Sequence, residues 1–335
     1  MRAAFYERTG ASHEVLRVSN VPTPVPGPGE ARVRLEWSGV NPSDVKSRAG
    51  TRNPKLPFPQ IIPHSDGSGS IDMVGAQVSP ARVGERVWVW NAAWGRASGT
   101  AAEYVVLPAN QAVPLPDNIA TEVGACLGIP ALTAWHAVNV DGGVAGKTVL
   151  VAGGAGSVGH YAIQIAKLLG AKRIISTVSG PEKGELAKAA GADLVINYRS
   201  EDVVDLVLKG TSGAGVDRII EVDLGVNLPM DIKLLSRDGE IIVYGSTASD
   251  ISVPFVPMIL KNIRVKFFIV YNLNDHDRAG SLVGVNGMLA RNQLTHNIAQ
   301  RLPLDRIAEA HDLVEHGKAI GNVVIQIADL APEVA

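Results

Sequence analysis

Residues 148–159 read TVLVAGGAGSVG, and residues 160–170 continue as HYAIQIAKLLG. The stretch begins with a β-branched apolar run, which predicts a strand, and a glycine-rich turn follows it. After the turn, apolar residues recur at helical spacing, which predicts a helix. Gly154, Gly156 and Gly159 form a GxGxxG pattern. In this pattern the first glycine is expected to make the tight turn, the second to admit a pyrophosphate, and the third to let the helix pack close to the strand. The stretch therefore predicts a dinucleotide site and a redox function.

The residues around the turn supply the context that the pattern needs. Ser157 and Val158 open the helix, whose first N–H groups and positive dipole end suit a phosphate. Gly170 stands where the helix is expected to stop, and a second strand at 173–178 completes a βαβ unit. The alternative is a βαβ unit whose glycines serve packing alone.

Bulk composition narrows the class of protein. The chain has 335 residues, enough for two domains, and is 46% hydrophobic and 19% charged, which is typical of a globular protein. A net charge of −2 does not favour nucleic acid or an anionic membrane as a partner. The N-terminus lacks the apolar core of a signal peptide, so a cytoplasmic location is expected. The single cysteine, Cys126, lies in an apolar context and is interpreted as a buried core thiol.

The pattern of elements changes along the chain. Residues 1–125 read as irregular and all-β, with short strands between Gly and Pro turns. Residues 126–269 alternate strands and helices, which is typical of a doubly wound parallel sheet. The strands are expected at 148–152, 173–178, 193–197, 217–222, 240–244 and 263–269, and helices at 182–190, 201–209 and 228–235. The tail, 270–335, ends in a strand at 322–327 and is expected to return to the first domain.

The order of these parts resembles the medium-chain dehydrogenase/reductase superfamily, and within it the zinc-independent quinone oxidoreductases, the zeta-crystallin-like group. The resemblance rests on PGPGE at 26–30, GVNPSD at 39–44, SDGSG at 65–69, VGERV at 83–87 and GIPALTA at 128–134. It implies an α/β fold with a GroES-like β-rich substrate domain (1–125 with 270–335) and a Rossmann NADP(H)-binding domain (126–269). It also implies a homodimer.

The same resemblance argues against a catalytic zinc. Zinc members of the superfamily place Cys where this chain has Asn41, and Gly-His-Glu where it has His64-Ser65-Asp66. An amide and a hydroxyl are poor replacements for thiolate and imidazole ligands. No metal is expected. Without a Lewis acid, an electron-poor quinone or enone is a more reasonable partner for a hydride than a simple alcohol.

The residues after the second strand of the βαβ unit predict NADPH. NAD-specific sites carry an Asp or Glu about 20 residues past the glycines, whereas this strand ends at the small, neutral Ser179. Lys183 and Arg199 would attract a 2′-phosphate. In the family that the chain resembles, a Lys and a Tyr at the positions of Lys183 and Tyr198 contact that phosphate. The alternative is that Lys183 is a solvated helix charge, and Glu182 would weaken the prediction if it pointed inward.

Asn41, Asp44 and Thr133 are the catalytic candidates. The family places residues like Asn41 and Thr133 beside the nicotinamide, and Asn41 could hydrogen-bond a substrate carbonyl or the carboxamide. Their alternatives are a turn-forming Asn before Pro and a helix-interior Thr bonded to its own backbone. Asp44 with Lys46 could relay a proton, or could be a surface pair. Some relatives have a Tyr near Arg52, and this chain has none.

Other residues complete the predicted cofactor site. Gly245 and Ser246 follow a strand at the carboxyl edge of the sheet, where open α/β sheets bind ligands. Phe268 and Val270 end the last strand, and Asn322 matches a polar family position. Trp88, Trp90 and Trp94 either line a flat pocket or form the core. The histidines at 13, 276, 296, 311 and 316 are scattered and suggest no cluster.

The predicted function is therefore that of an NADPH-dependent quinone oxidoreductase. An NADPH-dependent enone or 2-alkenal reductase needs the same cofactor geometry and an open pocket, so the sequence leaves both open. A non-enzymatic NADPH-binding protein, crystallin-like or RNA-binding, is the alternative of another class. The lack of a basic stripe stands against RNA.

Overall fold

The computed structural model describes residues 1–51 and 53–327, and these form two compact units. One unit comprises residues 1–129 and 286–335, of which 52 and 328–335 are not described, and the other comprises residues 130–285. The domain boundaries predicted from the sequence lie at 125/126 and 269/270. In the structure, the chain passes from one unit to the other at 129/130 and 285/286. That the first unit binds substrate and the second binds NADP(H) stays a prediction. Arg52 lies outside the described residues.

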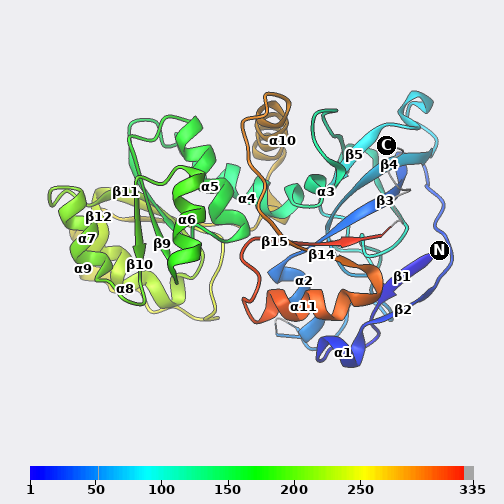
Figure 1. The fold of residues 1–335 in the computed structure, drawn as a ribbon, viewed down its shortest axis with the longest axis horizontal. Helices are drawn as coiled ribbons and strands as arrows, with labels where there is room; N and C mark the ends of the chain where they lie inside the picture. The colour runs from blue at the N-terminus through cyan, green and yellow to red at the C-terminus, as the bar shows by residue number, and fades with distance from the viewer. Residues whose placement is uncertain (52, 328–335) are drawn as a thin grey trace. The chain divides into compact units, whose positions relative to one another are not determined.

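The unit 130–285 is a doubly wound α/β domain (Figure 1). Its six parallel strands are paired in the order β10-β9-β8-β11-β12-β13, the order of a Rossmann sheet. These strands are β8 (Thr148–Ala152), β9 (Arg173–Val178), β10 (Leu194–Asn197), β11 (Val216–Glu221), β12 (Leu235–Val243) and β13 (Arg264–Phe267). The helices are α4 (Leu132–Asn139), α5 (Ser157–Leu168), α6 (Pro181–Ala190), α7 (Val203–Gly210), α8 (Leu224–Leu234), α9 (Phe255–Leu260) and most of α10 (Asp275–Ala290).

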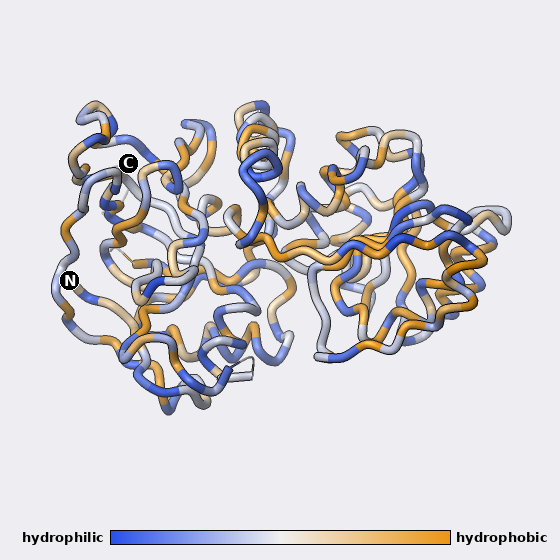
Figure 2. The backbone as a smooth tube through the Cα atoms, turned by 180° about the vertical axis from the view of Figure 1, so that it is seen from behind, coloured by the Kyte–Doolittle hydropathy of each residue, from blue (hydrophilic) through white to orange (hydrophobic). Residues whose placement is uncertain are grey.

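The parallel sheet is built from apolar runs, because helices cover both faces of such sheets. The hydrophobic runs of its central strands appear as orange segments in Figure 2. Leu150, Ile175, Ile219 and Ile241 are fully buried in one cluster. The doubly wound prediction is confirmed. The limits of several elements shift: α8 begins at Leu224 rather than 228, β12 begins at Leu235 rather than 240, and β13 ends at Phe267 rather than 269. Phe268 and Val270 therefore follow the last strand and do not end it.

The other unit is β-rich, as the GroES-like prediction requires. Its main sheet follows the order β14-β15-β3-β4-β5-β7, with β6 also paired to β3. The strands of this unit are β1 (Arg2–Phe5), β2 (Arg17–Asn20), β3 (Glu30–Val40), β4 (Asp66–Val74), β5 (Arg86–Val89), β6 (Tyr104–Pro108), β7 (Ala112–Pro114), β14 (Ile298–Pro303) and β15 (Asn322–Gln326). The expected return of the tail is observed, because β15 pairs antiparallel with β3.

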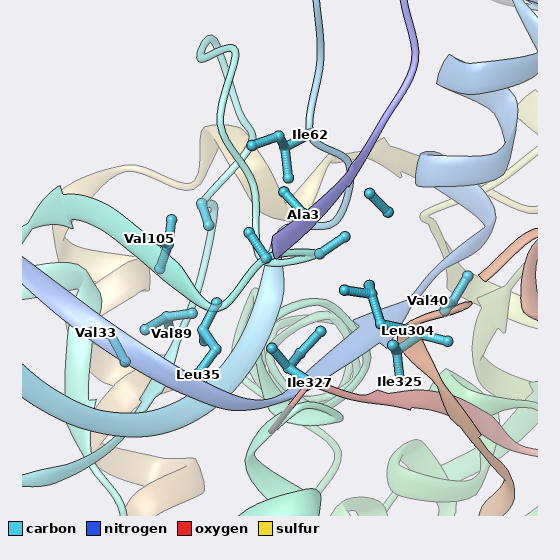
Figure 3. Packing of buried hydrophobic residues seen from close by; sticks show 14 of the residues in the cluster. Ala3, Val33, Leu35, Val40, Ile62, Val89, Val105, Leu304, Ile325 and Ile327 are labelled. Carbon is cyan, nitrogen blue, oxygen red and sulfur yellow. The ribbon is translucent and has the colours of Figure 1, made fainter. Parts of the chain in front are cut away.

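Apolar side chains from both ends of the chain fill the core of this unit. Figure 3 shows Val33 and Leu35 of β3 packed with residues from distant segments, among them Ile325 of β15 and Leu304. Trp88 is fully buried, which confirms the core interpretation for that residue, whereas Trp94 is 42% exposed. The thiol of Cys126 is buried as predicted, and burial raises its pKa.

The prediction of an all-β first part was wrong in one respect that bears on the site. The helices α1 (Ser12–Val15), α2 (Pro42–Ala49) and α3 (Thr121–Gly124) lie within it, and α11 (Ile307–Glu315) packs against α1 and α2. Helix α2 begins directly after β3, since Pro42 suits the first helical position and Asn41 and Asp44 form a capping box. Among the described residues, no helix is long and apolar enough to cross a membrane.

Candidate functional site

The glycine turn after β8 is built as the sequence predicts, with one correction. The left-handed residue of the turn is Gly153 (φ +70°), not Gly154. Gly154 is needed for a different reason, because a Cβ on it would lie 2.0 Å from Ser176 Oγ. On Gly159, a Cβ would lie 2.3 Å from the Gly153 carbonyl oxygen, so only glycine lets α5 pack against the turn.

Gly156 differs from its neighbours in the turn. A Cβ there would meet only the Gly153 carbonyl oxygen, at 3.2 Å. Gly156 is also the N-cap of α5, and Ser157 and Val158 are its first residues. The N–H groups of this first turn have no carbonyl partner within the helix, so the turn offers donors and a positive dipole end to an anion.

The predicted 2′-phosphate residues lie together at the end of β9. Lys183 Nζ donates a 2.9 Å hydrogen bond to Ser179 Oγ, one turn of α6 connecting the two positions. Lys183 is thus held at the strand end, which argues against a freely solvated helix charge. Glu182 is exposed, as the NADPH prediction needs, and Tyr198 after β10 is 52% exposed.

The loop after β12 carries two further candidates. A Cβ on Gly245 would lie 2.3 Å from the Val222 carbonyl oxygen, so this loop and the turn after β11 approach closely. The hydroxyl of Ser246 donates to the Ala248 carbonyl oxygen at 2.8 Å and accepts from the Ala248 N–H at 3.1 Å. Both positions follow the carboxyl end of β12, one of the strands of the parallel sheet.

His136, which the sequence did not single out, shares α4 with Thr133 and contacts the ring of Phe268. Thr133 and His136 are buried and lie three residues apart on α4. The ring centroids of His136 and Phe268 are 4.6 Å apart. Arg278, on α10, donates a hydrogen bond to the Val270 carbonyl oxygen. Burial lowers the pKa of His136, so this imidazole is neutral at pH 7.

Asn41 and Asp44 belong to a buried polar cluster in the β-rich unit. The Asp44 carboxylate accepts a 2.8 Å hydrogen bond from the Asn41 N–H. The Asn41 amide donates a 2.9 Å hydrogen bond to Asp66 Oδ2, which also accepts from the Ile129 N–H at 2.9 Å. The side chain therefore caps α2 and binds Asp66, so the turn-forming alternative describes part of its role.

Burial sets the electrostatics of these two carboxyls. Desolvation raises the pKa of Asp44 to about 7, against the opposing effect of its hydrogen bonds to Asn41. Desolvation also raises the pKa of Asp66 well above its usual value, and the nearby Asp44 charge adds to the shift. Asp44 is only slightly exposed, so the surface-pair alternative for Asp44 and Lys46 does not describe it.

A zinc ion does not fit this donor set. The positions compared with zinc ligands carry the Asn41 amide and the Ser65 hydroxyl, and the nearby Asp66 carboxyl accepts hydrogen bonds from two N–H groups through the same oxygen. In the described ranges, 1–51 and 53–327, no three His, Cys, Asp or Glu side chains are grouped so as to hold a metal.

Sequence reasoning missed a histidine pair in the same unit, and the expectation of scattered histidines was wrong for His311. Nε2 of His64 lies 2.9 Å from Nε2 of His311, and both rings are fully buried. His64 also adopts a left-handed backbone conformation, with φ +76°, that is unusual for a residue other than glycine. The two residues are 247 positions apart, so no local signal could have connected them.

Asn322 has a role in packing. Its backbone N–H and its side-chain amide both donate to the Asn297 carbonyl oxygen, at 2.9 and 3.0 Å. These bonds tie β15 to the segment before β14. A contact of Asn322 with a cofactor stays a prediction.

Comparisons with known proteins agree with this architecture. A model of the alcohol dehydrogenase GroES-like domain matches residues 27–117, and a model of zinc-binding dehydrogenases matches residues 157–283. The quinone oxidoreductase of Pongo abelii is 32% identical over 317 residues, covering 93% of this chain and 94% of that protein.

Two solved structures extend these comparisons. An NAD-dependent alcohol dehydrogenase superposes with a TM-score of 0.89 at 32% identity, over 98% of this chain and 100% of that one. A mycobacterial protein solved in complex with NADPH superposes with a TM-score of 0.85 at 28% identity, over 97% and 99% of the two chains. Both cofactor types thus occur among proteins of this fold.

Proposed function

Since the chain belongs to the quinone oxidoreductase family of the medium-chain dehydrogenase/reductase superfamily, we propose that it transfers a hydride from NADPH to a quinone. The chain is an oxidoreductase of this superfamily with a nicotinamide cofactor. The preference for NADPH and the quinone substrate are the proposed parts. The observation that carries the cofactor choice is the hydrogen bond from Lys183 Nζ to Ser179 Oγ, which holds a cation where an NAD site would hold a carboxylate.

The residues of the Rossmann unit fit a dinucleotide phosphate. Gly156 leaves space in front of the α5 N-terminus, so the pyrophosphate would lie against the first N–H groups of that helix. Lys183, with Ser179 and Tyr198, would hold the 2′-phosphate through charge-assisted hydrogen bonds. When bound, the nicotinamide supplies the hydride, and the protein orients the ring and excludes water.

Asn41, Asp44 and Thr133 are proposed to face the reacting groups. The Asn41 amide is fixed by Asp66, so it cannot rotate freely, and a fixed N–H donor is a suitable partner for the oxygen of a carbonyl that accepts a hydride. Asp44 titrates near neutral pH because burial raises its pKa to about 7, which suits a group that returns a proton to the reduced oxygen. No step requires a metal.

We also propose a homodimer formed through the Rossmann unit. Strand β13 is the last strand of its sheet and has one strand neighbour among the described residues. Helix α9, directly before it, exposes Phe255 (70%), Val256 (62%) and Leu260 (70%). An edge strand beside an exposed apolar helix favours association with a second copy. Light scattering of the purified protein tests this proposal, and a monomer at micromolar concentration would contradict it.

The reaction is tested by mixing the protein anaerobically with NADPH or NADH and following absorbance at 340 nm after addition of 1,4-benzoquinone or 9,10-phenanthrenequinone. Controls without protein are essential, because quinones oxidise NADPH on their own. Rapid oxidation of NADPH and slow oxidation of NADH is the expected result.

A panel of small enones and 2-alkenals, run in parallel, separates the alternative reductase. Faster turnover of enones than of quinones would replace the proposed substrate class and leave the cofactor unchanged. Faster turnover with NADH would overturn the cofactor choice and leave the reaction class unchanged.

A further inference from the structure

A buried pair of acids lies behind the loops that would hold the cofactor. Glu221 is the last residue of β11 and is fully buried. Its Oε1 accepts hydrogen bonds from the Asp223 N–H at 2.5 Å and from the Asn227 side-chain amide at 2.9 Å. One oxygen of this carboxyl is thus used to shape the turn between β11 and α8.

A second buried carboxyl, that of Asp231, lies beside Glu221. Asp231, on α8, is also fully buried, and its side chain is within hydrogen-bonding reach of Glu221. Neither oxygen of Asp231, nor Oε2 of Glu221, receives an N–H or a side-chain O–H from another described residue. Within residues 1–51 and 53–327, no Lys or Arg forms an ion pair with either carboxyl.

Two buried carboxylates in contact, with no cation between them, would be strongly unfavourable. A single proton resolves the conflict, since a protonated Asp231 donates its O–H to Glu221. Glu221 then keeps its negative charge, which the two N–H donors on Oε1 stabilise. The pair therefore shares one proton in the folded protein.

Hydrogen bonds connect this pair to the loop after β12. The Asp223 carboxylate accepts from the Thr247 N–H at 2.8 Å and from the Thr247 hydroxyl at 3.0 Å. The Leu224 N–H donates to the Gly245 carbonyl oxygen at 3.3 Å. Glu221 thus fixes the turn at 222–224, and this turn is hydrogen-bonded to the loop at 245–248, which contains Gly245 and Ser246.

We propose that Asp231 is a positioning residue for the cofactor: its shared proton with Glu221 holds the turn after β11, and through Asp223 and Thr247 that turn holds the loop at 245–248 in its binding shape. The inference rests on the proposed function, because it takes that loop as part of the nicotinamide cofactor site. Asp231 thereby acts on binding while touching neither cofactor nor substrate.

The proposal makes cofactor binding sensitive to alkaline pH. Burial and the Glu221 charge raise the pKa of Asp231 to about 9. The other titratable groups that face Glu221 are Asp223 and the phenol of Tyr244. Above that pH the proton is lost, the two carboxylates repel each other, and the turn at 222–224 loses its support.

The test is the dissociation constant of NADPH, and separately of NADH, measured by titration of the full-length protein from pH 6.5 to 10. The parent and Asp231→Asn are compared, since the amide that this substitution introduces donates an N–H to Glu221 at every pH. Asp205→Asn is the matched control, because Asp205 lies on α7 of the same unit in an exposed ion pair with Lys209. Unfolding midpoints are recorded over the same range.

The parent is expected to lose affinity above pH 9, by at most about tenfold per pH unit. D231N should bind as the parent does at pH 7 and keep that affinity to pH 9.5, whereas D205N should follow the parent. Equal alkaline losses in the parent and D231N would overturn the proposal, as would a D231N that changes only the unfolding midpoint. If the parent binds neither cofactor, the proposed function fails. The unfolding midpoints then still test the shared proton, because the parent and D205N should lose stability toward pH 9 and D231N should not.

Discussion

Nε2 of His64 lies 2.9 Å from Nε2 of His311, at one end of a row of buried hydrogen bonds. Only one arrangement of protons satisfies every bond in this row. The Thr100 hydroxyl donates to the Asp66 carbonyl oxygen at 2.6 Å, so it must accept from Ser38, at 2.8 Å. Ser38 in turn must accept from Nδ1–H of His64, at 2.8 Å. A neutral His64 then accepts at Nε2 from Nε2–H of His311, and both tautomers are assigned from the network.

The two buried histidines predict that acid lowers the stability of the folded protein. Burial lowers the pKa of His64 to about 3 and that of His311 well below 6.5. Between these values and the ordinary value of 6.5, the unfolded chain binds protons that the folded chain does not. The free energy of unfolding therefore falls as pH falls through this window, by up to about 1.4 kcal/mol per pH unit for each histidine.

The variant His311→Asn removes one of the two groups, so its loss of stability between pH 6.5 and 4.5 should be shallower than that of the parent. Urea unfolding at several pH values measures the slope. His13→Asn, at an exposed position on α1, is the control and should reproduce the parent slope. An unchanged slope in H311N would show that the pair is not responsible.

The contact between Lys183 and Ser179 predicts cofactor selectivity. Lys183→Ala should weaken NADPH binding by about 10- to 100-fold, the scale of a hydrogen bond to a charged group, and leave NADH binding unchanged. Lys188→Ala, on the exposed part of the same helix and paired with Glu185, should change neither. Isothermal titration of both cofactors measures the effect, and equal losses for NADPH and NADH in K183A would contradict the assignment.

Alanine substitutions at two glycines of the turn should have different effects on stability and on cofactor affinity. Gly159→Ala places a methyl group 2.3 Å from the Gly153 carbonyl oxygen, so it should lower the unfolding midpoint as well as cofactor affinity. Gly156→Ala meets only one atom, at 3.2 Å, so it should fold nearly normally and lose affinity for the pyrophosphate. Thermal unfolding alongside cofactor titration separates the two. A G156A protein with full affinity would show that the phosphate does not approach this residue.

A buried arginine predicts a large loss of stability. Arg218 is fully buried, forms a 2.7 Å ion pair with Glu240, and donates to the carbonyl oxygens of Val138 and Val140 at the end of α4. Arg218→Ala should cost about 3–5 kcal/mol, because it leaves the buried carbonyl oxygens of Val138 and Val140 without their donor and leaves the Glu240 carboxylate with Lys147, at 2.9 Å, as its closest remaining cation among the described residues.

Arg264 provides the matched control, since it approaches the same glutamate at 3.6 Å but is 67% exposed. Arg264→Ala should cost less than about 1 kcal/mol. Chemical denaturation measures both variants. Similar losses would mean that burial does not decide the contribution of these arginines.

The local pattern around residues 148–178 was enough to predict the parallel sheet. Apolar strands, a glycine turn and a helix of 3.6-residue period are short-range signals, and β8 and β9 begin and end at the predicted residues. The proximity of Lys183 to Ser179 was also accessible, because both lie within one strand end and one helical turn. Helix α2 departs from the all-β expectation, because its start signal, the Asn41–Asp44 capping box with Pro42 at the first helical position, directly follows the strong strand pattern of β3.

The sequence by itself determined the family and the alternation of strands and helices between residues 126 and 269, because both depend on neighbours in the chain. Only the tertiary structure decided which buried polar groups meet. Asn41 with Asp66, His64 with His311, and Glu221 with Asp231 are pairs whose partners come from different elements, and folding removes water from both members at once. The protonation and the orientation of these pairs follow from their shared burial, and no local pattern in the sequence reveals which groups are buried together.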